Sequence, residues 1–169
     1  MLMAPSETKL QRLAPQFHKS ISVMHDRLEE LLSAKPFTMM DKPRGLDKVK
    51  AVYLFSDGDY PFYVGRTQNL GRRLSQHCNE GSAHNQSSVA FKLACRDLKI
   101  KRQKYKKGST PAALLRDHVD LKPAFQAWKD CMKKMSIRWV EEGDPVTQTL
   151  LEIYCSVALN TPHNDFATH

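Results

Sequence analysis

The chain has 169 residues, of which 41% are hydrophobic, enough to form the core of one ordinary domain with a short appendage. Mean hydropathy is −0.52, and no apolar run approaches the roughly 18 residues of a membrane helix, which excludes an integral membrane protein. The N-terminal stretch MLMAPSETKLQRLAP has no apolar signal core, and the four cysteines are scattered without a CxxC pair. We therefore expect a cytoplasmic protein with reduced thiols.

The net charge of +8 is concentrated in one part of the chain. Residues 92–135 hold 13 lysines and arginines against 4 aspartates, a net of +9, so the other residues together are close to neutral. One interpretation of this basic segment is a solvated helical surface. The concentration of charge favours the other interpretation, a face that binds a polyanion.

The first predicted element in chain order is a helix over residues 15–34. Its apolar residues recur at helical spacing, at Phe17, Ile21, Met24, Leu28 and Leu31. Prolines and a glycine in residues 35–48 indicate a linker. We assign 1–47 as an N-terminal arm and 48–169 as the main domain. The arm either packs on that domain, which we favour, or joins a partner chain.

A β-hairpin and two helices are predicted next. VKAVYLF (49–55) and FYVG (62–65) are strand-like, and SDGDYP between them carries turn residues. Asn69 suits the N-cap of a helix LGRRLSQHC at 70–78. A second helical stretch covers about 87–98.

The remaining elements begin after the charged loop KIKRQKYKKGSTP. Helical patterns cover 112–119 and 123–135, and a strand pattern follows at 136–142. Asp144 and Pro145 suit the start of a last helix. These elements predict an α+β fold, with a small three-stranded antiparallel sheet flanked by helices and a basic helical insertion at about 92–135.

Arg73 and His77 lie four positions apart, so they share one face of the helix at 70–78. Alone, such a pair is most often a pair of exposed neighbours. The hairpin, however, places Tyr53 and Tyr63 on neighbouring strands, directly before this helix. The four side chains together are candidates for a reaction centre.

Around these residues the sequence resembles the GIY-YIG nuclease family. VYL (52–54) stands where the first triplet of the family belongs, and YVG (63–65) stands where the second does. VYL departs from GIY at two positions but keeps the tyrosine. The steps from Tyr63 to Arg73 and from Arg73 to His77 also follow the family pattern. The resemblance implies the family fold and the hydrolysis of phosphodiester bonds.

The resemblance covers about 48–91 and 136–169 and is interrupted by the basic insertion. Glu152 falls where the family carries an acidic metal ligand, and Asn164 falls where the family carries an asparagine. The resemblance thus implies that Glu152 holds Mg²⁺ or Mn²⁺, and Mg²⁺ commonly uses few protein ligands and keeps several waters. Without the resemblance, Glu152 is an ordinary solvent-facing helix residue.

The predicted last helix has two faces that bear on Glu152. Small polar residues share the face of Glu152 and suit an enclosed cleft better than open surface: Thr149, Ser156 and Asn160. We expect the buried face to be an apolar stripe of Val146, Leu150, Ile153 and Val157.

Hydrolysis requires an activated water, stabilised phosphate charge and help for the leaving oxygen. By the resemblance, Tyr53 is the general base, although a tyrosine with a pKa of about 10 needs nearby positive charge for this. His77 either relays the proton from Tyr53, which we favour, or is itself the base. Arg73 is the phosphate clamp, because its guanidinium fork matches two phosphate oxygens. Tyr63 orients water or phosphate, or is a core aromatic.

The other candidate residues are expected to have supporting roles. Asn164 orients the loop near Glu152 or contacts a phosphate, and Arg66 and Arg72 are secondary phosphate contacts. Basic residues of the insertion would contact DNA phosphates without reading sequence: Lys99, Lys101, Arg102, Lys104, Lys106 and Lys107.

We therefore expect a divalent-metal-dependent DNA endonuclease of restriction, defence or DNA-processing type. Its expected partner is double-stranded DNA, and a homodimer is an option because one such site cuts one strand at a time. The rival hypothesis is a non-catalytic nucleic-acid-binding module with the same fold, which has no need of the lone carboxylate of Glu152. A protein-interaction domain built on the N-terminal helix is a third.

Overall fold

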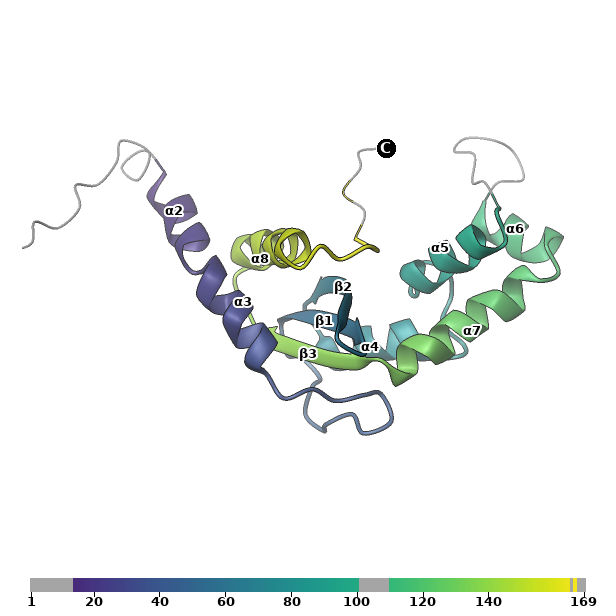
Figure 1. The fold of residues 1–169 in the computed structure, drawn as a ribbon, viewed down its shortest axis with the longest axis horizontal. Helices are drawn as coiled ribbons and strands as arrows, with labels where there is room; N and C mark the ends of the chain where they lie inside the picture. Colours follow the sequence, from purple (N-terminus) through teal and green to yellow (C-terminus); the bar gives the residue numbers. More distant parts are fainter. Residues whose placement is uncertain (1–13, 101–109, 165, 167–169) are drawn as a thin grey trace, which may run out of the picture.

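A three-stranded antiparallel sheet lies at the centre of the structure, a computed structural model that describes residues 14–100, 110–164 and 166. The strands run in the order β2-β1-β3, with bounds β1 (Ala51–Asp57), β2 (Tyr60–Thr67) and β3 (Ser136–Glu141). β1 pairs with both neighbours, so β2 and β3 are the edges. Helices lie on both sides of this sheet (Figure 1).

The helices precede, interrupt and follow the strands, which confirms the predicted α+β class. They are α2 (Pro15–Ser22), α3 (Met24–Ser33), α4 (Leu70–Cys78), α5 (Ser88–Asp97), α6 (Pro111–Asp117), α7 (Leu121–Lys134) and α8 (Pro145–Ala158). The single helix expected over 15–34 is thus two helices, which meet at Val23. Within the described ranges, no helix has both the length and the apolar character needed to span a bilayer.

The sheet is covered on both faces because side chains alternate along β1. Tyr53 and Phe55 face a core formed with α4, α5 and α7, whereas Val52 and Leu54 face a second core formed with α3 and α8. Residues 51–56 are all buried as a result. Helix α3 contributes to the second core, as expected for a packed N-terminal arm, while α2 buries no residue.

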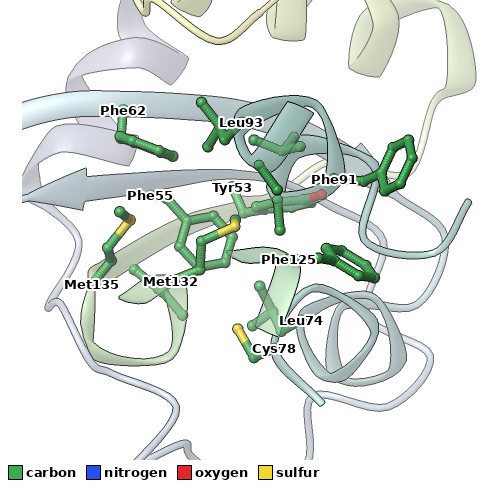
Figure 2. Packing of buried hydrophobic residues seen from close by; sticks show 14 of the residues in the cluster. Tyr53, Phe55, Phe62, Leu74, Cys78, Phe91, Leu93, Phe125, Met132 and Met135 are labelled. Atoms are coloured by element: carbon green, nitrogen blue, oxygen red, sulfur yellow. The ribbon is translucent and has the colours of Figure 1, made fainter. Parts of the chain in front are cut away.

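The larger of the two cores surrounds the tyrosine of the first strand. Figure 2 shows Tyr53 and Phe55 among Leu74 of α4, Phe91 of α5 and Phe125 of α7. The phenol of Tyr53 therefore lies between the sheet and three helices. Helix α7 and the second half of α5 belong to the basic insertion.

The hairpin and α4 follow one another closely. The turn is shorter than expected, because Gly58, with φ of +56°, lets β1 extend to Asp57 and β2 begin at Tyr60. Asn69 caps α4 as predicted, and its side-chain oxygen accepts a hydrogen bond from the Arg72 N–H at 2.9 Å. The hydroxyl of Thr67, the last residue of β2, is hydrogen-bonded to the backbone of Asn69, which holds the start of α4 near the end of the strand.

The buried face of α8 differs from the prediction. Asp144 caps the helix as expected, but Val146, Ile153 and Val157 are 59%, 41% and 70% exposed. The face turned inward carries Thr147, Gln148, Leu151 and Cys155. The expected apolar stripe is therefore wrong.

A polar side chain selects the inward face of α8. The Gln148 amide donates to the backbone carbonyls of Thr67 at 3.0 Å and Glu142 at 3.1 Å. Thr67 is the last residue of β2, and Glu142 directly follows the last residue of β3. Buried polar groups cost free energy when left unpaired, so satisfying them turns Gln148 inward and rotates the apolar stripe toward solvent.

Candidate active site

Tyr53 and His77 form a hydrogen-bonded pair inside the larger core. Tyr53 comes from the central strand and His77 from the inner face of α4, and both side chains are 0% exposed. The Tyr53 hydroxyl oxygen lies 2.8 Å from His77 Nε2. The rings of Phe55 and Tyr63 meet the imidazole edge to face, with centroids 5.5 and 5.7 Å away. The i to i+4 spacing on α4 thus directs His77 toward the sheet rather than toward solvent.

Gly65 makes space for the Tyr53 ring. The two residues are direct partners across β1 and β2. A Cβ built on Gly65 would collide with the phenol carbons and the hydroxyl oxygen of Tyr53. The glycine of the YVG triplet is therefore required by the close approach of this side chain.

Arg73 lies one helical turn before His77 and reaches the same hydroxyl. Its Nε donates to the Tyr53 oxygen at 3.3 Å, and its Nη1 donates to the backbone carbonyl of Gln86 at 2.9 Å. The guanidinium is half-buried. The Tyr53 hydroxyl is thus held between a cation and an imidazole.

Burial keeps both members of the pair neutral. Desolvation, with the nearby positive charge of Arg73, lowers the pKa of His77 to about 3. When Nε2 accepts from Tyr53, the neutral imidazole carries its hydrogen on Nδ1, which is buried and has no partner among the described residues. Desolvation raises the pKa of Tyr53, and the neighbouring Tyr63 adds to this while Arg73 opposes it.

Glu152 approaches from the opposite face of the sheet, around the edge strand β2. Its Oε2 lies 3.0 Å from Nε of Arg66, which is a residue of β2. The Glu152 side chain is 20% exposed, and burial raises its pKa while Arg66 opposes the shift. The positive charge of Arg73 also acts on this carboxylate. The described residues contain no group of three or more histidines, cysteines, aspartates or glutamates that could enclose a metal ion.

Asn164 is bound to the backbone of the edge strand. Its Oδ1 accepts from the Val64 N–H at 2.9 Å and from the Thr161 hydroxyl at 2.8 Å, and its Nδ2 donates to the Val64 carbonyl at 2.8 Å. This two-way bond takes the place of a neighbouring strand at β2. It holds the segment after α8 beside Tyr63 and Gly65.

Comparison with known proteins identifies the family. Residues 49–114 match the family model of the GIY-YIG catalytic domain. The match supports assignment of this segment of the chain to the GIY-YIG family. GIY-YIG domains are nuclease domains in general. No curated protein and no solved structure matches the chain.

The GIY-YIG match has different limits from the resemblance seen in the sequence. It continues through the start of the basic insertion, which was expected to interrupt it, and stops at 114. Tyr53, Arg73 and His77 lie within it, whereas Glu152 and Asn164 lie beyond it.

Two further residues support the GIY-YIG site and carry no signal in the sequence. The Gln86 carbonyl accepts from Arg73, and the Ser87 hydroxyl donates to the His77 carbonyl at 2.7 Å. Both contacts end on backbone oxygens, which no residue type reveals. Of the expected DNA contacts, Arg72 and Lys99 are exposed. The other expected lysines and arginines lie outside the described residues, namely Lys101, Arg102, Lys104, Lys106 and Lys107.

Proposed function

We propose that this GIY-YIG chain is a divalent-metal-dependent DNA endonuclease of restriction, defence or DNA-processing type. One observation carries the proposal, the hydrogen-bonded row of Arg73, Tyr53 and His77 with the half-buried carboxylate of Glu152 in electrostatic range of Arg73. A proton acceptor, a phosphate clamp and a metal ligand are the three parts that phosphodiester hydrolysis requires.

Glu152 fits a Mg²⁺ or Mn²⁺ ion that keeps most of its water. It is a single hard oxygen ligand, still 20% exposed, with one ion pair to Arg66 on Oε2. Mg²⁺ sites commonly use one or two carboxylates, with water and substrate phosphate as the other ligands. A bound ion would supply positive charge for the phosphate and for the attacking and leaving oxygens.

Arg73 is the proposed phosphate clamp. Two of its N–H groups are used by Tyr53 and Gln86, which fix the guanidinium plane. A guanidinium has five N–H donors, so donors remain for phosphate oxygens. Arg66 is the proposed second contact, since it lies beside Glu152 at the edge of the sheet.

Tyr53 is the proposed general base, and His77 assists it. His77 is neutral at physiological pH, so its Nε2 can accept a hydrogen from the Tyr53 hydroxyl. The raised pKa of Tyr53 keeps the phenol protonated in the free protein. A phenolate at Tyr53 therefore needs further positive charge next to the hydroxyl, which a divalent ion held by Glu152 would supply.

The basic segment 92–135 is proposed to hold double-stranded DNA. Exposed cations on its described elements include Arg96, Lys99, Lys122, Lys133 and Lys134. If about 6 to 10 phosphates are neutralised, affinity falls by roughly 10³- to 10⁵-fold between 50 and 200 mM salt. A weak salt dependence would remove this role from the segment.

The test is cleavage of plasmid and short duplex DNA with Mg²⁺ or Mn²⁺, beside EDTA and Glu152→Ala controls. We expect cutting only by the wild type with metal, while Glu152→Ala still binds DNA. Discrete fragments indicate sequence-specific cleavage, and nicked rather than linear plasmid indicates that one protomer acts at a time. DNA binding without cutting under either metal would overturn the proposal in favour of a non-catalytic binding module.

A further inference from the structure

A buried lysine of the basic insertion contacts the loop that supports Arg73. Lys129, on α7, is 2% exposed. Its Nζ donates to the carbonyl of Glu80 at 2.5 Å and to that of Ser82 at 3.3 Å, and lies 4.4 Å from the ring centroid of Phe125. Lysines are almost never fully buried unless they are paired. Here two backbone carbonyls and an aromatic face take the place of a carboxylate.

The segment that Lys129 holds continues directly to the candidate active site. We call residues 79–87, which join α4 to α5, the α4–α5 loop. The Ala83 N–H donates to Gln86 Oε1 at 2.9 Å, and the Gln86 N–H donates back to the Ala83 carbonyl at 3.0 Å. This tight turn presents the Gln86 carbonyl to Arg73.

On the side of α7, the α4–α5 loop borders a cavity. A cavity of 830 Å³ lies between the loop and the helix, and both Ser82 and Lys129 line it. The ammonium of Lys129 joins the helix to the loop across this cavity through its two hydrogen bonds. On the other side, the Ser87 hydroxyl fixes the end of the loop to the His77 carbonyl.

We propose that Lys129 is a positioning residue, which holds the α4–α5 loop and, through the Gln86 carbonyl, the guanidinium of Arg73. The helix that carries DNA-binding charge thus also sets the geometry of the phosphate clamp. A lysine in this place is expected to affect turnover more than DNA affinity, because its charge faces inward. This inference rests on the proposed nuclease function only for its kinetic readout.

The test compares Lys129→Ala with Lys122→Ala, which removes an exposed charge from the same helix. In Lys129→Ala we expect kcat to fall by about 10- to 100-fold, as for a reacting group displaced by about 1 Å, with KM changed less than threefold. In Lys122→Ala we expect KM to rise instead. Propylammonium, which replaces the missing end of the side chain, is expected to restore turnover in Lys129→Ala alone.

A second readout does not require cleavage. The NMR resonance of Arg73 Nε–H, assigned with Arg73→Lys, is expected to shift in Lys129→Ala, to return with propylammonium, and to stay unmoved in Lys122→Ala. If Lys129→Ala does not fold, Lys129→Met keeps the apolar stem and gives the same measurement. An unmoved resonance, or a loss of turnover that propylammonium leaves unchanged, overturns the inference. If the wild type cuts no DNA, the resonance alone decides, so failure of the nuclease proposal is seen separately.

Discussion

Acid is expected to destabilise this protein through His77, and His77→Phe is expected to remove most of that sensitivity. In the folded state the imidazole is 0% exposed and its pKa is lowered from 6.5 to about 3. In the unfolded chain it titrates near its ordinary value. Between these two pH values the unfolded state binds one more proton than the folded state, so stability falls as pH falls.

The size of the effect follows from the two pKa values. Each pH unit between them contributes about 1.36 kcal/mol to the free energy of unfolding. From pH 6.5 to 4.5 the loss through His77 is about 2.3 kcal/mol, because the unfolded imidazole is only half protonated at pH 6.5. This is a large part of the roughly 5 to 15 kcal/mol that stabilises a typical domain. His163, whose pKa is also lowered by burial, acts in the same direction but titrates equally in both proteins.

The measurement is urea unfolding followed by circular dichroism at several pH values from 7 to 4.5. His77→Phe loses the bond to Tyr53, so its stability at pH 7 is expected to be lower than that of the wild type. Only the slopes of the free energy of unfolding against pH are compared. The slope of the wild type should be steeper by about 1 kcal/mol per pH unit. Parallel curves would refute the reasoning, because they would mean that His77 is not held neutral in the folded state.

Three other predictions concern the same site. Gly65→Ala is expected to lower stability by about 1 to 3 kcal/mol in urea unfolding, because the added methyl meets the Tyr53 ring, whereas Gly143→Ala, whose Cβ meets nothing, should change it by less than about 0.5 kcal/mol. Arg73→Lys should reduce kcat by about 10²- to 10³-fold in a plasmid assay with KM nearly constant, since an ammonium cannot replace the fork; an unchanged kcat would exclude the clamp. The logarithm of kcat/KM should rise from pH 6 to 9 without an inflection near 6.5, because the pKa of His77 is about 3 and that of Tyr53 is raised. A histidine-like inflection that disappears in His77→Phe would contradict this.

Local rules were sufficient to predict much of the fold and part of the site. Asn69 and Asp144 were identified as helix caps because each needs only its own side chain and an N–H three residues later. The shared direction of Arg73 and His77 follows from helical spacing alone. The position of both side chains near Tyr53 could be predicted because the hairpin is followed directly by the helix.

Other parts depended on contacts between distant segments. α8 carries apolar residues around much of its surface, so periodicity does not select a buried face, and Gln148 selects it through carbonyls of Thr67 and Glu142. The ion pair of Arg66 with Glu152 crosses the edge of the sheet between residues 86 positions apart. No sequence pattern predicts either contact, because each joins residues that only the folded chain brings together.

The fit of Tyr53 against Gly65 means that the two signature triplets are one steric unit. VYL and YVG are separate stretches of sequence, but the aromatic ring of the first occupies the volume that a side chain would take in the second. A smaller residue at position 53 would free position 65 to carry a methyl group, whereas any full-sized ring at 53 forbids it. The double variant Tyr53→Ala with Gly65→Ala should therefore lose less stability than the sum of the losses in the two single variants. Such a difference would show that positions 53 and 65 are energetically coupled.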